Sequence, residues 1–458
     1  MAVRTRRRLG ASLAAPSFLA AATLLLFLLG AGSMKVPPMD DTYIHLVYGS
    51  SLFSGAPLCY NGSMPSSGFT SPLWLLPSSL ASLAGSEAGP VLLMGFSLAA
   101  ALVALLMLDT GTAAVLVFAG PFLFHASSGM ETALSCIAVI AVWKWIDTAG
   151  SPQTGGLLLA GAFLVRPELV CLAVPMLVSM RNGSVPGTVR LLLPAAVSGV
   201  LWMVWNLHSA GLPLPSTFYA KQAVSWPSAA AAGLPGLLRG LLLTSPLLLF
   251  AAATSVITLL RRKDDGRRSA ALALVPLILF FTALATQPNA YFQMRYYLPA
   301  ITASALAAGL WLKGLGKKRR LNTIILAVSM IPGLLVFSSR RLDASIDVLN
   351  IDVLPARYLR EEAFAEETVA AADIGAVKWI TGMEVLDLDG LVTPERLPGS
   401  GREGWSWIRE RADYLLAFPT QYSALVESGS GSLEFLAGFG SPACVICGED
   451  SVALWRIN

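Results

Sequence analysis

Residues 37–74 read PPMDDTYIHLVYGSSLFSGAPLCYNGSMPSSGFTSPLW, and they form the most informative stretch of the chain. The stretch contains the adjacent carboxylates Asp40 and Asp41, and no further charged residue of either sign follows before Glu87. A long apolar run at 9–34 precedes it. Charged groups beside a bilayer are costly and usually functional. The stretch therefore predicts a reaction centre at the edge of a membrane.

The composition predicts a polytopic membrane protein. The 458 residues are 55% hydrophobic and 13% charged, and the mean hydropathy is +0.65. Too little polar surface remains to cover a soluble globule of this size. The net charge of +4 is small and its positive residues cluster beside apolar runs, which indicates membrane orientation and argues against nucleic-acid binding. The five cysteines lack zinc-ligand spacing, so no metal framework is predicted.

The first apolar run predicts a membrane span that is retained in the mature protein. Arg4, Arg6, Arg7 and Arg8 precede it, as positive charge also precedes a signal peptide. The apolar core of a signal peptide is shorter, however, at roughly 7–15 residues, whereas a bilayer span needs about 20. With the N-terminus in the cytoplasm, Asp40 and Asp41 lie on the extracytoplasmic side.

Further apolar segments continue to about residue 338. They run at about 88–108, 112–126, 130–147, 155–165, 167–180, 189–208, 236–260, 269–286, 295–312 and 321–338. Arg166-Pro167-Glu168 separates two of them, because proline interrupts the helical ladder. Including the first span we expect about eleven membrane segments, and their alternation places the basic clusters in the cytoplasm, as the positive-inside rule requires.

The same alternation gathers a set of polar residues on the extracytoplasmic side, where we expect one cavity to hold most of them. The set is Asp40, Asp41, His125, Glu131, Arg166, Glu168, His208, Tyr219, Lys221 and Arg295. The histidines lack close metal-ligand spacing, so hydrogen bonding is the better interpretation of each.

The residues after Asp41 predict an amphipathic helix that lies in the membrane interface. Ile44, Val47, Tyr48 and Leu52 recur at helical spacing, and Asp41 and His45 share the other face. A loop rich in hydroxyl, amide and aromatic groups follows, which suits a sugar. Its candidates are Tyr60, Asn61, Ser67, Phe69, Thr70 and Trp74. The aromatic residues are equally consistent with an interface belt.

From about residue 340 the composition is that of a soluble domain. Strand-like runs at 383–388 and 414–418 are separated by helical or glycine-rich pieces, which predicts a small α/β domain. We therefore expect a membrane domain at 1–339 with an interfacial loop at 35–87, and an extracytoplasmic domain at 340–458. There Cys444 and Cys447 form either a short-loop disulfide or two buried thiols.

Seven motifs, in this order, resemble a bacterial group of GT-C glycosyltransferases. They are Asp40-Asp41-Thr42-Tyr43-Ile44, Ser67-Gly68-Phe69-Thr70-Ser71-Pro72-Leu73-Trp74, Gly129-Met130-Glu131-Thr132-Ala133-Leu134, Arg166-Pro167-Glu168, Leu214-Pro215-Ser216-Thr217-Phe218-Tyr219-Ala220-Lys221, Arg295-Tyr296-Tyr297-Leu298-Pro299 and Asp387-Leu388-Asp389-Gly390-Leu391. The group is similar to the mycobacterial terminal arabinofuranosyltransferase and to lipid-linked-sugar mannosyl- and aminoarabinosyltransferases. The resemblance covers nearly the whole chain, and departs from the pattern at Ser66-Ser67 and Ser216.

The resemblance implies a GT-C-like helical membrane fold and sugar transfer from a polyprenyl-phosphate donor. The acceptor hydroxyl belongs to a glycan, lipid or protein at the outer face of the bacterial cytoplasmic membrane. Such a hydroxyl needs a general base, and a single displacement inverts the anomeric carbon without a second carboxylate nucleophile. We expect Asp40 to be the base and Asp41 to be structural or to orient the acceptor. No cofactor is required by this scheme, and a divalent cation stays open.

Cations are expected opposite the acids, because the leaving group is a lipid phosphate. Arg166, Lys221 and Arg295 are the candidates. The full set of expected substrate-binding residues is His45, Tyr60, Asn61, Ser67, Phe69, Thr70, Trp74, Glu131, Arg166, Glu168, Tyr219, Lys221 and Arg295. The three cations also have structural alternatives. Arg166 could form an internal ion pair with Glu168 or Glu131, and Lys221 and Arg295 could snorkel to the membrane interface.

Other interpretations remain open for the acids and for the whole protein. Asp40 and Asp41 suit a helix N-cap, although capping explains only one of them. A transporter or flippase of a lipid-linked sugar also has polar residues and broken helices in the membrane, but it predicts an internal repeat, and the sequence shows none. A non-catalytic assembly subunit would leave the acid pair without a role.

Overall fold

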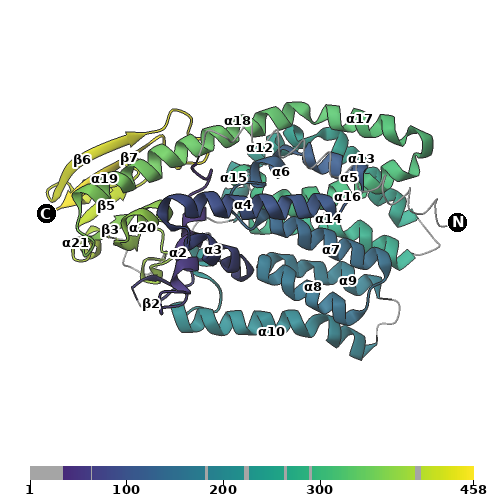
Figure 1. The fold of residues 1–458 in the computed structure, drawn as a ribbon, viewed down its shortest axis with the longest axis horizontal. Helices are drawn as coiled ribbons and strands as arrows, with labels where there is room; N and C mark the ends of the chain where they lie inside the picture. Colours follow the sequence, from purple (N-terminus) through teal and green to yellow (C-terminus); the bar gives the residue numbers. More distant parts are fainter. Residues whose placement is uncertain are drawn as a thin grey trace.

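The computed structural model describes residues 35–62, 64–180, 184–220, 226–261, 266–287, 291–397 and 404–458. Helices run along the long axis of the molecule and a sheet-containing domain lies at one end (Figure 1). The predicted span at 9–34 and the candidate Lys221 lie outside the described residues. The helical architecture with a small C-terminal sheet domain is the one predicted.

Long apolar helices form the membrane part. They are α4 (Gly85–Leu106), α7 (Thr132–Thr148), α8 (Pro152–Val165), α10 (Val185–Ala210), α14 (Gly266–Thr286) and α16 (Leu298–Gly314). Among the described residues, α4, α10 and α14 are each long and apolar enough to cross a membrane, and the number rises from 3 to up to 5 if each of two bent helix pairs is one span. The count of about eleven segments stays a prediction.

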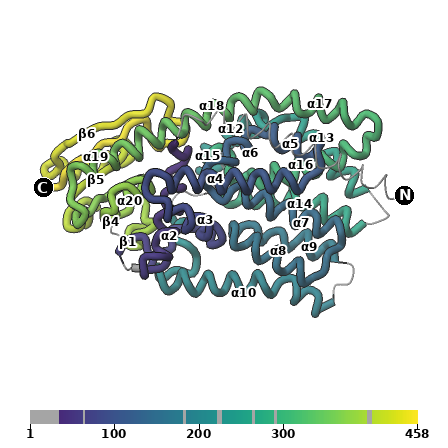
Figure 2. The backbone as a smooth tube through the Cα atoms, viewed as in Figure 1, coloured from purple at the N-terminus to yellow at the C-terminus, as the bar shows by residue number. Residues whose placement is uncertain are grey.

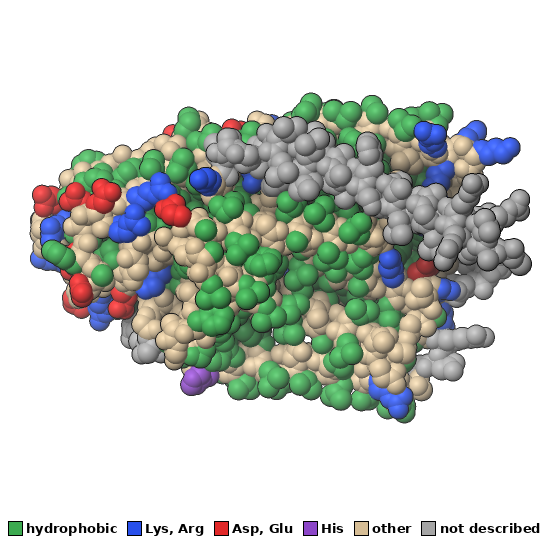
Figure 3. Space-filling model, in the orientation of Figure 1, with side chains coloured by type: hydrophobic (Ala, Val, Ile, Leu, Met, Phe, Trp, Pro, Cys, Tyr) green, Lys and Arg blue, Asp and Glu red, His purple; other side chains and the backbone are tan. Residues whose placement is uncertain are grey.

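The molecular surface has an apolar middle. Hydrophobic side chains cover the middle of the face in Figure 3, and charged side chains gather mainly at its two ends. Helix α10 contributes to the apolar surface with exposed Val197, Val200, Leu201 and Val204. An exposed apolar surface of this extent is expected of a protein that faces lipid.

Several predicted segments are broken helices. The segment at 155–180 divides into α8, η2 (Pro167–Leu172) and α9 (Ala173–Ser179), and extended Arg166 separates α8 from η2, which confirms the predicted break. The prediction of one segment at 236–260 is wrong. Helices α12 (Trp226–Thr244) and α13 (Pro246–Arg261) meet there at an angle of 86°, because Pro246 lacks the N–H that would continue the ladder. The segment at 112–126 is likewise α5 (Thr110–Val117) and α6 (Gly120–His125).

A nearly continuous helical run joins the membrane part to the C-terminal domain. It consists of α17 (Arg319–Ser329), α18 (Ile331–Val348), the π-helical turn η5 (Leu349–Val353) and α19 (Leu354–Glu362). Helices α17 and α18 bend by 42° at their junction. The predicted domain boundary at 339/340 therefore falls inside α18, and no flexible linker separates the two parts at that point.

The C-terminal domain is a five-stranded mixed sheet in the order β4-β3-β5-β7-β6. The strands are β3 (Thr368–Ala371), β4 (Glu384–Asp387), β5 (Tyr414–Ala417), β6 (Leu433–Gly440) and β7 (Ser451–Ile457). Strand β3 pairs in parallel with β4 and β5, whereas β7 is antiparallel to β5 and β6. Successive residues Val369 and Ala370 enter different hydrophobic clusters, so both faces of β3 are covered. The predicted strands at 383–388 and 414–418 are confirmed.

The stretch that follows Pro37 lies between the two parts of the molecule. It forms α2 (Asp41–Ser51), β1 (Cys59–Asn61), β2 (Met64–Pro65), η1 (Pro72–Trp74) and α3 (Leu75–Ser82). Helix α2 packs against α3 and against α20 (Gly375–Thr381) of the C-terminal domain (Figure 2). A Cβ at Gly49 would lie 2.5 Å from the backbone of Ser78, so α2 and α3 require glycine at their contact.

The helix after Asp41 begins where the sequence predicts it, but its predicted position in the membrane interface is wrong. Residues 42–49 and Ser51 are all buried in protein. Ile44 and Val47 contact the core of the C-terminal domain, and Leu46 contacts a cluster shared with α20. The apolar residues of this helix are covered by a segment more than 300 residues away in the chain, and Asp41 and His45 of its polar face contact Arg295 and Glu131.

Candidate active site

A cavity of about 1770 Å³ lies where the membrane helices meet the C-terminal domain. Helix α2, the loop after β2, α12 and α18 contribute its walls, together with the segment 291–297 and the ends of β3 and β4. The cavity therefore lies at a junction between the two parts of the fold, where ligand sites are frequently found.

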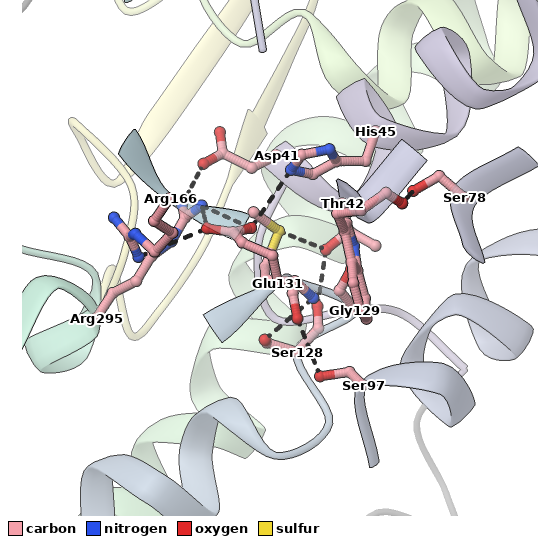
Figure 4. Close-up of polar contacts among 12 residues, drawn as sticks. Asp41, Thr42, His45, Ser78, Ser97, Ser128, Gly129, Glu131, Arg166 and Arg295 are labelled. Carbon is pink, nitrogen blue, oxygen red and sulfur yellow. Dashed lines mark hydrogen bonds and ion pairs between the residues drawn. The ribbon is translucent and has the colours of Figure 1, made fainter. Parts of the chain in front are cut away.

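A buried ion network lies beside the cavity and is centred on Glu131, the residue before α7 (Figure 4). Its carboxylate lies 2.9 Å from Arg295 Nη2, and 3.5 Å from both Arg166 Nη1 and His45 Nε2. The side chain of Glu131 is 1% exposed. Because each partner comes from a different element, this one carboxylate fixes α2, α7, the break after α8 and the turn before α16 relative to one another.

Two further carboxylates complete the network. Asp41 Oδ2 accepts a hydrogen bond of 2.6 Å from Arg295 Nη1, and Glu168 Oε1 accepts one of 2.7 Å from Arg166 Nε. The guanidinium of Arg166 also lies 4.7 Å from the ring centre of Tyr296. The two arginines thus face three carboxylates, and their positive charge is compensated within the protein. The internal ion pair considered for Arg166 is present.

A strained backbone segment positions Arg295. Phe292, Gln293 and Met294 have positive φ angles of 53°, 55° and 65°, which non-glycine residues rarely adopt in succession. Gln293 is held from three sides: its carbonyl oxygen lies 3.1 Å from His125 Nε2, its amide donates to the Val445 carbonyl, and its Oε1 accepts from Arg340. The strain is maintained by these contacts, and the segment leads directly into Arg295.

The carboxylate of Asp40 binds the C-terminal domain. Its two oxygens accept hydrogen bonds of 2.6 Å from the backbone N–H groups of Gly375 and Ala376, at the start of α20. A Cβ at Gly375 would lie 2.4 Å from the Asp40 carbonyl oxygen, so this approach requires glycine. The suggested role of Asp40 as a side-chain cap of α2 is wrong, because its side chain makes no hydrogen bond to that helix.

Burial raises the pKa of Asp40 from 3.8 to about 7. The two backbone hydrogen bonds oppose this rise, and the charge of Asp41 adds to it. An acid whose pKa lies near neutral pH is half ionised under ordinary conditions and suits proton transfer. Asp41, in contrast, is tied to Arg295 and has a side chain that is 37% exposed.

The structure adds Asp352 and Asp373, which the sequence did not single out, and brings Asp389 of the Asp387–Leu391 motif to the same cavity. Asp352 of η5, Asp373 after β3 and Asp389 after β4 line the cavity. Burial, together with the charges of Asp40 and Asp389, raises the pKa of Asp373 to about 8. Asp389 follows the predicted strand at 383–388, a position typical of ligand-binding residues, whereas β3 before Asp373 was not predicted.

Three cavity-lining cations, Arg239, Arg340 and Arg396, were also missed. Arg239 of α12 and Arg340 of α18 line the cavity, and neither has an ion pair to a carboxylate within the described ranges. Arg239 interrupts an apolar run, and a charge in such a place is a recognisable signal of a functional site. Arg340 was assigned to the soluble domain, which hid its position in the membrane helix α18.

The other predicted residues divide into two groups. Asp40, Asp41, His45, Phe69, Thr70, Arg166, Glu168 and Arg295 line the cavity, and Glu131 holds three of them. Tyr60, Asn61, Ser67, Trp74 and Tyr219 are not among the lining residues.

Protein contacts account for the residues outside the lining. Tyr60 donates to the carbonyl of Ile374, and Asn61 bonds both backbone groups of Val385, so both attach the loop to the C-terminal domain. Ser67 lies 3.1 Å from the hydroxyl of Ser216, Trp74 donates to Gly129, and Tyr219 lies edge-on against Phe218. The loop chemistry that suggested a sugar serves packing at these positions.

The β6–β7 loop closes one wall of the cavity. Cys444 and Cys447 are joined by a disulfide in this loop. The N–H groups of Cys444 and Ile446 donate to Asp347 at the end of α18, at 3.0 and 3.3 Å. Ile446 and Cys447 line the cavity. Within the described residues, no group of three or more His, Cys, Asp or Glu side chains is arranged to hold a metal ion.

Comparison with solved structures identifies the fold. ArnT from Cupriavidus metallidurans in the apo state is 12% identical, with a TM-score of 0.59 over 96% of this chain and 97% of ArnT. ArnT bound to undecaprenyl phosphate is 11% identical, with a TM-score of 0.60 over the same shares. ArnT is an aminoarabinosyltransferase and a GT-C enzyme. The GT-C-like fold predicted from the motifs is confirmed.

Sequence comparison is less informative than structural comparison. A family model described as a domain of unknown function (DUF8728) matches residues 350–454, which are nearly the whole C-terminal domain. No curated protein matches the chain in sequence. The comparisons therefore establish the architecture, and the cavity carries the evidence for function.

Proposed function

We propose that this protein is an integral membrane glycosyltransferase that moves a sugar from a polyprenyl-phosphate donor to an acceptor hydroxyl. The observation that carries the proposal is the large cavity at the junction of an ArnT-like fold, lined by carboxylates and by arginines. ArnT has been crystallised with undecaprenyl phosphate, which supports a lipid phosphate as the donor carrier. The proposal does not specify which sugar is transferred.

Asp40 is the proposed general base. Each carboxylate oxygen has about two acceptor sites, so the bonds from Gly375 and Ala376 leave lone pairs that can take the hydroxyl proton. Its pKa of about 7 favours this transfer at neutral pH. The acceptor oxygen then forms the bond to the anomeric carbon as the bond to the phosphate oxygen breaks, with inversion. Asp41, held by Arg295, orients the acceptor or the helix.

Arg239 and Arg340 are the proposed ligands of the donor phosphate. The charges of Arg166 and Arg295 are already compensated by Glu131, Asp41 and Glu168. A phosphate leaving group needs positive charge that the protein has not neutralised, because its own charge grows as the glycosidic bond breaks. Arg166 and Arg295 then contribute mainly by holding the cavity in shape.

The proposed orientation puts the cavity and the C-terminal domain outside the cytoplasmic membrane of a bacterium. Figure 3 shows both acidic and basic side chains at the end with the C-terminal domain, whereas the charged side chains at the remote end are mostly Lys and Arg, as the positive-inside rule predicts for a cytoplasmic end. In intact cells, a membrane-impermeant maleimide should label Glu384→Cys and should not label Lys318→Cys. The reverse pattern would place the cavity in the wrong compartment.

The transfer reaction itself is tested with purified protein and polyprenyl-phosphate sugars. Wild-type protein should bind undecaprenyl phosphate and should release it from a sugar-loaded donor in the presence of an envelope extract as acceptor. A protein that binds no lipid phosphate and consumes no lipid-linked sugar would not be a transferase of this class.

A further inference from the structure

The carboxyl ends of the parallel strands of the C-terminal domain face the cavity. From β3 the chain proceeds to β4 on one side, and β5 then pairs on the other side of β3. In open α/β sheets, ligands bind outside the carboxyl ends of the strands where connections diverge in this way. Asp373 after β3, Asp389 after β4 and Tyr422 after β5 all line the cavity at this position.

A buried acceptor atom without a partner lies at the same place. Asp352 is 5% exposed and lines the cavity, and its Oδ1 has no hydrogen-bond partner. An unsatisfied buried carboxyl oxygen is costly, and such an atom in a cavity is available to a donor that a bound ligand supplies. Nearby, Tyr422 donates a hydrogen bond of 2.7 Å to Asp389, so a phenol ring and a carboxylate are presented together.

The charge of this wall selects the class of ligand. Asp40, Asp352, Asp373 and Asp389 are carboxyl groups, and Arg396 is the cation beside Asp389. A phosphate or another anion finds no counter-charge among four carboxyl groups and is repelled by those that are ionised, whereas sugar hydroxyls exchange hydrogen bonds with both forms of a carboxyl group. The basic pair Arg239 and Arg340 lies on other elements, α12 and α18, so acidic and basic side chains reach the cavity from different elements.

We propose that the crevice formed by Asp352, Asp373, Asp389 and Tyr422 is the acceptor subsite, and that the acceptor is an uncharged, hydroxyl-rich glycan. This inference rests on the proposed transferase function and adds the class of its acceptor. Asp40 bonds the start of α20, directly after the β3 end of the crevice, so the base lies next to the hydroxyl that is to attack.

Binding of uncharged oligosaccharides tests the subsite. The probes are disaccharides and trisaccharides of arabinose, mannose, glucose and N-acetylglucosamine, with digalacturonic acid as the anionic comparison. The full chain in detergent micelles is observed by saturation-transfer NMR. At least one uncharged probe should bind, digalacturonic acid should bind more weakly, and Asp389→Asn and Asp352→Asn should each weaken binding roughly tenfold or more.

The controls separate a local effect from a loss of fold. Glu384→Gln lies at the opposite end of β4, is exposed, and should leave saccharide binding unchanged. Asp352→Asn replaces a buried carboxyl group by an amide of the same size, so its melting temperature should not fall. If no uncharged probe binds, if binding survives both crevice substitutions, or if the anionic probe binds best, the acceptor assignment is overturned.

Binding of undecaprenyl phosphate to the same variants keeps the two proposals apart. A protein that binds the lipid phosphate but no uncharged glycan retains the proposed function and loses the acceptor assignment. A protein that binds the glycan through Asp389 but no lipid phosphate loses the proposed function and keeps a glycan-binding crevice. The crevice variants should bind the lipid phosphate as the wild type does.

Discussion

The cavity has two acidic regions that differ in how the protein treats their charge. Around Glu131, two arginines neutralise the carboxylates, and each arginine contacts two of them. Around Asp40, carboxyl groups face one another across the domain junction, and only backbone N–H groups bind the Asp40 carboxylate. The first region is built to be rigid, and the second is left free to change its protonation state.

The largest effect is expected from Asp40→Asn, which tests the role of Asp40 as general base. Transfer should fall by roughly 10²–10⁴-fold, the usual contribution of a general base, while donor binding persists. Asparagine also replaces one carboxylate oxygen by an NH₂ group that cannot accept from Gly375 or Ala376, so the melting temperature has to be measured beside the rate. Asp41→Asn is the matched control and should cost less. Full activity in Asp40→Asn, or a larger loss in Asp41→Asn, would remove the base assignment.

Glu131→Gln tests the rigid region. It leaves Arg295 and Arg166 buried without their shared counter-charge, and breaking a buried ion pair costs about 3–5 kcal/mol. A large fall in the melting temperature in detergent is expected. Glu168→Gln is the control, because Glu168 is 26% exposed and has one cationic partner, Arg166. Equal melting temperatures for the two variants would show that Glu131 is not the centre of the network.

Substitutions of the arginines test which of them bind the lipid phosphate. Arg340→Gln and Arg239→Gln should each weaken undecaprenyl-phosphate binding roughly tenfold or more, the usual worth of a hydrogen bond to a charged group. Arg166→Lys should leave lipid binding nearly unchanged and lower the melting temperature, because lysine cannot bond Glu168 and Glu131 in the same planar geometry. If Arg166→Lys alone abolishes lipid binding, the phosphate is bound by the ion network after all.

The smallest effect expected is that of pH. The pKa of Asp40 is raised from 3.8 to about 7, so the folded protein binds more protons than the unfolded chain between these values. The free energy of unfolding should therefore fall as pH rises through this window, whereas transfer should rise as Asp40 loses its proton near pH 7. Melting curves from pH 5 to pH 8 give the first trend, and Asp40→Asn should flatten it. A steeper trend in that variant would contradict the assignment of the proton to Asp40.

Local chemistry explains what the sequence could predict. Proline after Arg166 predicted a break in the helix, and short strand-like runs predicted β4 and β5. Order and type of the motif residues predicted the GT-C-like architecture. Pro246 was a comparable signal for the bend between α12 and α13, but the continuous apolar character of the run concealed it.

Partners that are distant in the chain explain what the sequence could not predict. The burial of α2 depends on α20, and the hydrogen bonds of Asp40 come from Gly375 and Ala376. No periodicity within residues 37–74 contains that information. For the same reason Tyr60 and Asn61 were read as ligands of a sugar, although their partners are backbone groups of Ile374 and Val385.

The helical run from α18 through η5 to α19 has a mechanical consequence. A domain joined by a flexible linker can move aside to exchange substrates, but a domain joined by a nearly continuous helix cannot. A lipid would have to slide in sideways between helices, and a glycan would have to thread in from the water. The π-helical turn η5, which carries Asp352, interrupts the regular α-helical hydrogen bonding between α18 and α19. Any small rocking of the domain would pivot there, and would move a carboxyl group of the crevice directly.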